Sequence, residues 1–139
     1  MDGPGQTMER LRGAMNDRDI EAFVSLMHPD YASEQPAHPD RQFDGREQVR
    51  ENWTALFGSM PDFTAEILDT STTEDTAWTE WVWRGGSGRL EVRGVTLFTV
   101  RDGLIVRGRL YMEAVEQGGP GIRSTVVSLT EMATGTADE

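Results

Sequence analysis

The sequence predicts an α+β fold, with helices in the first half of the chain and a mostly antiparallel sheet in the second. Up to about residue 60 the apolar residues recur at helical spacing. After Pro61 the apolar runs are rich in β-branched and aromatic residues, and clusters of turn residues separate them. Helices that precede the strands, rather than alternate with them, favour packing on one face of a curved sheet.

Three helices are predicted before residue 61. The first covers residues 7–15 and the second covers residues 20–27, where Pro29 is expected to end it. The third begins at Asp44, which heads a capping-box pattern, and carries its apolar residues on one stripe as far as residue 60. These periodicities predict that all three helices bury one face.

Four strands are predicted, over residues 63–69, 76–84, 94–100 and 104–113. The dipeptide Asp102-Gly103 separates the last two, and it is a strong signal for a tight hairpin. Within 104–113, strict alternation directs Leu104, Val106, Leu110 and Met112 to one face, and Ile105, Arg107, Arg109, Tyr111 and Glu113 to the other.

The strand over residues 76–84 carries tryptophan on both faces. Trp78 and Glu80 share one face, and Trp81 and Trp83 share the other. Both faces are therefore expected to be covered, one by the helices and one by a second subunit, because a large apolar patch is rarely left in water. We expect a homodimer through the outer face of the sheet, with Tyr111 and Trp81 or Trp83 in the interface.

Composition excludes several classes of protein. The chain has 139 residues and no cysteine, which excludes a disulfide framework and a thiolate metal site. The formal net charge of −11 disfavours binding to nucleic acid or to anionic lipid. The N-terminus resembles no signal peptide and no apolar run is long enough to cross a bilayer, so a cytoplasmic protein without a membrane span is expected.

We expect no metal and no cofactor. The two histidines are ten residues apart and lack a neighbouring pattern of carboxylates, and the chain contains no phosphate-binding or dinucleotide-binding glycine motif. The expected organisation is one domain over residues 1–116 and a tail over residues 117–139. A short amphipathic helix is predicted near residues 125–132 of the tail, followed by a disordered acidic end.

Five segments carry a resemblance to a known family: LMHPDY, FDGREQVRENW, PDF, GVTLFTVRDGLI and RLYME. They resemble the nuclear-transport-factor-2-like superfamily, and within it the SnoaL-like branch of small bacterial proteins. Ketosteroid isomerase, limonene epoxide hydrolase and polyketide cyclases are members of the superfamily. The resemblance implies a cone, in which a strongly bent sheet wraps three helices around an apolar pocket for a small hydrophobic molecule. It also implies a dimer.

The resemblance also indicates where catalytic residues are expected. The general-base aspartate of ketosteroid isomerase corresponds in place to Gln35, whose amide cannot accept a proton at neutral pH. The two aspartates of limonene epoxide hydrolase correspond to Glu80 or Val82 and to Leu110. Neither catalytic set is complete in this chain.

Three side chains remain as candidate acids or bases: Glu80, Glu34 and His38. If Glu80 faces the pocket, burial raises its pKa and suits it to general acid or base catalysis. If it faces outward, it is an ion-pair partner for Arg107 or Arg109. Glu34 and His38 lie in the segment EQPAHP, which we expect to line the mouth of the pocket, with an ordinary solvated loop as the alternative.

The candidate substrate-binding residues are Tyr31, Trp53, Phe57, Trp78 and Met112, each of which has a purely structural role as its alternative. Two function classes therefore stay open. The first is a cofactor-free acid/base enzyme of the isomerase, cyclase, dehydratase or epoxide hydrolase type. The second is a non-catalytic protein of the same fold, either a small-ligand-binding module or a dimerisation module.

Overall fold

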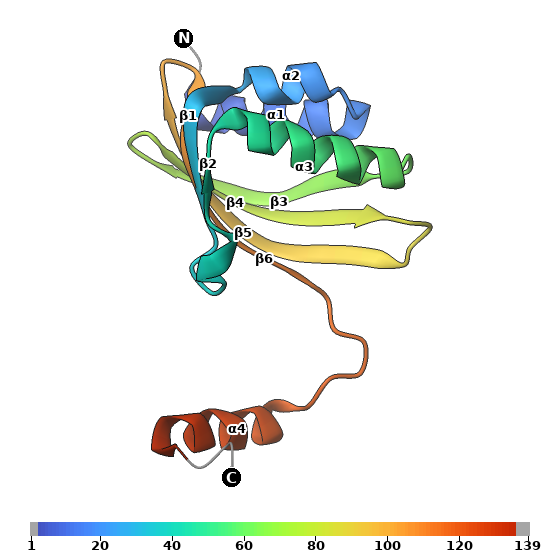
Figure 1. Ribbon diagram of the computed structural model, residues 1–139, viewed down its shortest axis with the longest axis vertical. Helices are drawn as coiled ribbons and strands as arrows, with labels where there is room; N and C mark the ends of the chain where they lie inside the picture. The colour runs from blue at the N-terminus through green and yellow to red at the C-terminus, as the bar shows by residue number, and fades with distance from the viewer. Residues whose placement is uncertain (1–2, 136–139) are drawn as a thin grey trace.

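A strongly bent sheet wraps around three helices, and a fourth helix stands apart (Figure 1). The computed structural model describes residues 3–135. The helices are α1 (Pro4–Asp17), α2 (Ile20–Ser25), α3 (Arg46–Ser59) and α4 (Ile122–Thr134), with a short 3-10 helix η1 (Pro39–Arg41). The strands are β1 (Met27–Glu34), β2 (Phe43–Asp44), β3 (Thr64–Thr73), β4 (Thr76–Gly85), β5 (Leu90–Arg101) and β6 (Leu104–Ala114).

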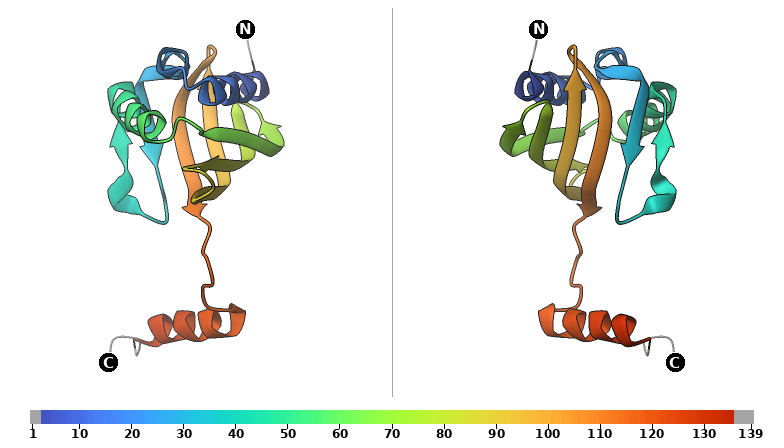
Figure 2. Two further views of the ribbon diagram at one scale, coloured as in Figure 1. Left: turned by 90° about the vertical axis from the view of Figure 1, so that its right-hand side faces the viewer. Right: turned by 90° about the vertical axis from the view of Figure 1, so that its left-hand side faces the viewer.

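The six strands form one sheet in the order β2-β1-β6-β5-β4-β3. Only β1 and β6 pair in parallel, so the sheet is mostly antiparallel. In the side views of Figure 2, helices α1 to α3 cover the concave face of the sheet and leave its outer face uncovered. The predicted α+β class, with helices on one face of a curved sheet, is confirmed. None of the helices described here is long and apolar enough to cross a membrane.

Two predicted helix boundaries are wrong. The second helix ends at Ser25, because residues from Met27 onward already form β1, and Pro29 lies within a stretch of β1 that has no regular register with β6. Asp44 forms no capping box, since it belongs to β2 and the N-cap of α3 is Gly45. Gly45 has a φ of 95°, a backbone conformation that favours glycine.

The predicted hairpin between β5 and β6 is confirmed, with positive φ values at both Asp102 and Gly103. The predicted strict alternation in β6 is wrong near its start. Thr99 pairs with Arg107 and Val100 pairs with Ile105, so Val106 is an extra residue in a β-bulge. The bulge buries Ile105 fully in the core and leaves Arg107 exposed.

Strand β4 directs Trp81 and Trp83 to the concave face, and the expectation that either belongs to an outer interface is wrong. Trp81 is 0% exposed, whereas Trp78 on the opposite face is 47% exposed. The indole Nε1 of Trp81 donates to Thr96 Oγ1 on β5 at 2.9 Å, so its one polar group is satisfied inside the core.

The edge strand β3 is held by side chains from the end of α1. Asn16 donates through Nδ2 to the carbonyl of Ala65 at 3.0 Å, and its Oδ1 accepts from the Ala65 amide at 2.7 Å. Arg18 donates to the carbonyl of Phe63. These bonds give the free edge of β3 partners that it would otherwise lack.

The substitution Thr96→Val keeps the shape of the side chain and removes the acceptor for Trp81 Nε1. A buried N–H without a partner is expected to lower the free energy of unfolding by about 1–3 kcal/mol, as measured by urea denaturation. Thr64→Val, on the exposed part of β3, is the control and is expected to change stability by less than about 0.5 kcal/mol. Equal effects at both positions would show that the Trp81–Thr96 bond is not a stabilising contact.

Candidate functional site

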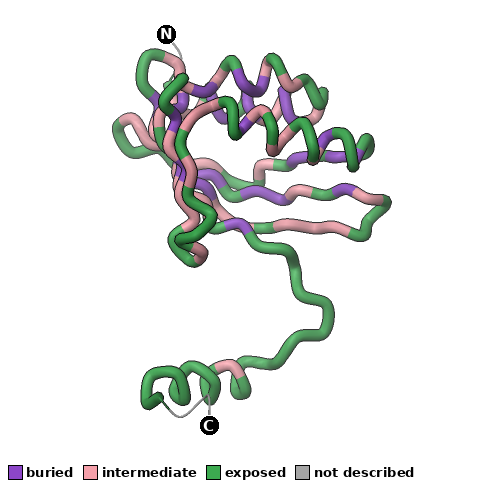
Figure 3. The backbone as a smooth tube through the Cα atoms, in the orientation of Figure 1, coloured by how far each residue is buried: buried purple, intermediate pink, exposed green. Residues whose placement is uncertain are grey.

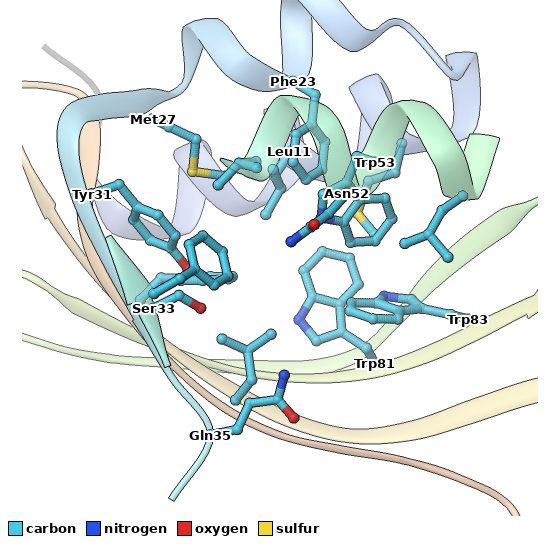
Figure 4. A pocket seen from close by; sticks show the side chains of 16 residues that line it. Leu11, Phe23, Met27, Tyr31, Ser33, Gln35, Asn52, Trp53, Trp81 and Trp83 are labelled. Atoms are coloured by element: carbon cyan, nitrogen blue, oxygen red, sulfur yellow. The ribbon is translucent and has the colours of Figure 1, made fainter. Parts of the chain in front are cut away.

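A pocket of about 200 Å³ lies between the helices and the concave face of the sheet (Figure 4). Side chains from α1, α2, α3 and from strands β1, β2, β4, β5 and β6 line it. Its aromatic lining consists of Phe23, Tyr31, Phe43, Trp53, Trp81, Trp83 and Phe98, and its aliphatic lining of Leu11, Met15, Met27, Val49, Leu56 and Leu110. The remaining lining residues are Ser33, Gln35 and Asn52. No Asp, Glu, His or Arg is among them.

The tryptophans form a packed aromatic wall on one side of the pocket. The rings of Trp53 and Trp83 meet edge to face, with centroids 5.3 Å apart and planes at 81°. Trp81 and Trp83 lie 6.2 Å apart at 61°. Such contacts fix the orientation of large rigid side chains, so the wall is largely formed before any ligand binds.

Gln35 presents its amide nitrogen to the pocket because Arg41 occupies its oxygen. Arg41 Nη1 donates to Gln35 Oε1 at 3.0 Å, and a guanidinium can only donate hydrogen bonds. This contact therefore assigns which end of the amide is oxygen. Figure 4 shows the Gln35 nitrogen turned toward the space between the lining side chains and its oxygen turned away.

Asn52 is arranged in the same way on the other side of the pocket. Its Oδ1 accepts from Gln48 Nε2 at 2.8 Å, one turn earlier in α3, which leaves the Nδ2 group directed inward (Figure 4). Nε1 of Trp83 has no hydrogen-bond partner within residues 3–135, but it is buried within the aromatic wall and is not exposed to the cavity. The two amide nitrogens are thus the inward donors of the pocket.

Burial raises the pKa of Tyr31 to about 12, and a hydrogen bond with the Ser33 side chain lowers it by a smaller amount. The phenol is therefore neutral at physiological pH. Tyr31 fits here because Gly108 on β6 has no side chain, since a Cβ at that position would overlap the Tyr31 hydroxyl and the Phe98 ring.

Of the residues proposed from the sequence to bind substrate, the structure places Tyr31 and Trp53 at the pocket. Phe57 and Met112 are buried in the surrounding core but do not line the pocket. Trp78 lies on the outer face of the sheet, because it is three residues before Trp81 and side chains of a strand alternate between faces.

Glu80 is also on the outer face and is exposed. The inward orientation that general acid or base catalysis would require is not found, since Trp81 occupies the inward position beside it. The outward ion pair of Glu80 with Arg107 or Arg109 is not found within residues 3–135 either. Arg107 pairs with Glu34 at 2.8 Å, and Glu80 lies opposite Val95 and Asp69 on the neighbouring strands.

Glu34 and His38 lie beside the pocket rather than in it. The His38 ring contacts the Glu113 carboxylate on β6, and Glu34 forms its ion pair with Arg107 on the same strand. Glu34 and His38 therefore hold the segment EQPAHP against β6, and Gln35, which lies between them in sequence, lines the pocket. One residue of this segment lines the pocket, and the two candidate acids and bases are on the surface.

Sequence reasoning missed Trp81, Trp83, Gln35 and Asn52 as pocket residues. A signal existed for Asn52, which lies three residues after Val49 and four before Leu56, on the apolar stripe of α3. Gln35 carries an amide, which is not a base, so a search for catalytic acids and bases does not select it. The sequence does not indicate which face of β4 is turned toward the pocket, because this strand carries aromatic side chains on both faces.

Comparisons with known proteins agree with this architecture. IdmH from Streptomyces antibioticus, provisionally assigned as a polyketide cyclase, is 25% identical to this chain over 95% of this chain and 99% of its own, with a TM-score of 0.65. A protein from Kribbella flavida DSM 17836, provisionally assigned as a ketosteroid isomerase, is 20% identical over 84% of this chain and 82% of its own, with a TM-score of 0.67. A provisionally assigned polyketide cyclase from Sinorhizobium meliloti is 20% identical over 78% of this chain and 94% of its own, with a TM-score of 0.64.

The last two structures show the fold alone at such low identity. No curated protein matches the chain. The family profile of the SnoaL-like domain matches residues 8–108, which include most of α1, all of α2 and α3, and every strand as far as the middle of β6. Because this match covers well over half of the chain, the protein belongs to the SnoaL-like family of the nuclear-transport-factor-2-like superfamily.

Proposed function

We propose that this chain is a cofactor-independent, cyclase-type protein whose pocket holds a small, uncharged, mostly apolar carbonyl compound. The observation that carries the proposal is the lining of the pocket, which joins an aromatic wall to two inward amide donors, Gln35 and Asn52, and has no charged group. An apolar wall favours an apolar ligand, and donors without matching acceptors favour a ligand that carries oxygen acceptors. The likeness to IdmH supports the cyclase type.

The lining favours chemistry that moves no proton to the protein. A ring closure that begins with removal of a proton needs a base, and the pocket offers neither carboxylate nor imidazole. Donors directed at a carbonyl oxygen can instead withdraw electron density from the carbon skeleton, while the aromatic wall holds the chain in a folded conformation. Glu80, Glu34 and His38 have no role in this proposal.

The same lining also suits a second candidate function, a protein that binds its ligand without transforming it. Deuterium distinguishes an acid/base cyclase from the proposed one, once a substrate is known. When the substrate carries deuterium on the carbons that become bonded, the proposed ring closure keeps all of it in the product, whereas an acid/base mechanism, which removes a proton from one of these carbons, releases one deuterium to water. A ligand that is bound and released unchanged identifies the binding module.

We also propose that the protein is a homodimer through the outer face of the sheet. Trp78 and Tyr111 support this, because both are large apolar side chains, 47% and 40% exposed, on that face. Tyr111 is one of the residues expected there from the sequence, whereas Trp78 takes the place expected for Trp81 or Trp83.

Ligand preference tests the pocket directly, with 4-phenyl-2-butanone and butylbenzene as a carbonyl compound and its hydrocarbon counterpart. The variant Trp78→Phe removes the one tryptophan outside the pocket region, so fluorescence then reports on Trp53, Trp81 and Trp83. The ketone is expected to bind about fivefold more tightly, which corresponds to one net hydrogen bond of about 1 kcal/mol. Equal affinities would contradict the assignment of the inward donors.

The substitution Gln35→Met, added to Trp78→Phe, keeps the length of the side chain and removes the amide. It is expected to weaken ketone binding about fivefold and to leave butylbenzene binding unchanged. Glu80→Gln is the matched control on the outer face, and it is expected to change neither affinity. A larger loss of ketone affinity in Glu80→Gln than in Gln35→Met would contradict the proposed pocket chemistry.

Alkaline titration tests whether Tyr31 is the buried neutral phenol that the pocket requires. The chain has no lysine and no cysteine, so in the variant Tyr111→Phe the absorbance near 295 nm between pH 9 and 13 reports on Tyr31 alone. Its midpoint is expected near pH 12.

The raised pKa also sets a pH dependence of stability. The unfolded chain releases the Tyr31 proton near pH 10 and the folded chain near 12, so the stabilisation is complete below pH 10 and declines as pH rises toward 12. The decline is expected to total about 2–3 kcal/mol and to be absent when Tyr31→Phe is added. A decline that persists in that double variant would show that another group causes it.

A further inference from the structure

Helix α4 carries an apolar stripe that contacts nothing in its own domain. Ile122, Val126 and Leu129 recur at i, i+4 and i+7, which places them on one side of the helix. No residue of α4 is buried, and Figures 1 and 3 show the helix standing clear of the domain. A helix of 13 residues is only marginally stable in water by itself, so this one needs a packing partner.

The same chain has a second uncovered apolar surface, on the outer face of β4, β5 and β6. We call the exposed Trp78 and Tyr111, with Leu97 and Arg109 beside them, the outer patch. Trp78 pairs in register with Leu97, and Leu97 with Arg109, so the patch runs continuously across three strands. A hollow of about 300 Å³ next to it is lined by Trp78, Leu97, Thr99 and Arg109, among others. It can receive side chains of a helix.

The α4 segment carries little charge, and the hollow beside the outer patch carries both signs, with Glu74 and Asp75 near Arg107 and Arg109. The chain has a formal net charge of −11, yet residues 117–135 contain one arginine and one glutamate, so this segment approaches a second copy with little repulsion. Glu131 lies on the opposite side of α4 from the stripe. With Arg123 as the one basic residue of α4 and a strongly acidic chain, an anionic lipid surface is the less favourable partner.

The connection to α4 points to a second copy. The Val115 amide still donates to the Glu91 carbonyl at 2.9 Å, so β6 keeps its direction up to that residue. Residues 116–121 then lead away from the sheet and span at most about 20 Å (Figure 2). The arm carries α4 away from the outer patch of its own chain, and in a twofold dimer an arm of this length can reach the other copy.

We propose that two copies of this chain exchange their C-terminal arms, so that the α4 stripe of each copy packs on the outer patch of the other. The exchange covers both α4 stripes and both outer patches of the two copies. No such surface is then left to bind a third copy, so the assembly closes as a dimer. The exchange rests on the homodimer proposed above and specifies that α4 of the other copy, and not its sheet, covers Trp78 and Tyr111. It is independent of the pocket and of the reaction proposed for it.

Two adjacent valines provide a matched test. Val126 lies on the stripe and Val127 lies on the other side of α4, and they are 49% and 50% exposed. Val126→Asp is expected to weaken dimerisation at least tenfold in sedimentation equilibrium, and Val127→Asp to change it less than twofold. Circular dichroism checks that both variants are folded. A monomeric parent chain, or a dimer that tolerates Val126→Asp, would overturn the proposal.

Crosslinking identifies which surface α4 contacts, and the absence of native cysteine removes any background. A Val126→Cys chain is mixed with a tagged Thr99→Cys chain, and the mixture is treated with bismaleimidoethane. Covalent heterodimers are expected at least tenfold more often than with tagged Ser59→Cys, an exposed position on α3. Equal yields would overturn the proposal. So would a chain with both Val126→Cys and Thr99→Cys that crosslinks only within itself, which would show that α4 docks on its own sheet.

Discussion

The orientation of β4 is the constraint on which the rest of the structure depends. Trp81 is completely buried on the concave face, and its indole N–H bonds to Thr96 on the next strand. Because side chains alternate along a strand, this one placement also directs Trp83 inward and Trp78 and Glu80 outward. A slip of one residue would bury a carboxylate and expose the largest side chain of the core. The aromatic pocket, its lack of charge and the exposure of Trp78 on the outer face all follow from this register.

The pocket obtains its polarity from neutral groups whose outer ends are already bonded. An ionised carboxylate in such an apolar setting would be strongly destabilised without a partner. Gln35 and Asn52 avoid that penalty, since each engages its oxygen with a neighbour outside the cavity and keeps its nitrogen for the interior. Arg41 therefore acts on the pocket without lining it, by fixing which end of the Gln35 amide faces inward. Such preorganised donors suit a carbonyl ligand better than a reaction that needs a base.

The segment EQPAHP shows how one short stretch serves both the pocket and the surface. Gln35 turns inward, while Glu34 and His38 on either side contact Arg107 and Glu113 of β6. These outer contacts join the end of β1 to the strand that also supplies Leu110 to the pocket and leads into the C-terminal arm. The β-bulge at Val106 makes this possible, because it keeps Arg107 outward and Ile105 inward within three residues.

The sequence by itself determined the features that arise from local periodicity and turn chemistry. It predicted the α+β class, three helices, the Asp102-Gly103 hairpin and the family, and it selected Tyr31 and Trp53 for the pocket. The tertiary structure decided the face on which the β4 tryptophans lie, the bulge in β6 and the direction of the two amides. Each of these depends on a partner distant in sequence or on strand register, such as Thr96 for Trp81 and Thr99 for Arg107. A pattern with aromatic residues on both faces of a strand contains no information about which face the helices will cover, because burial on either face satisfies the hydrophobic effect equally well.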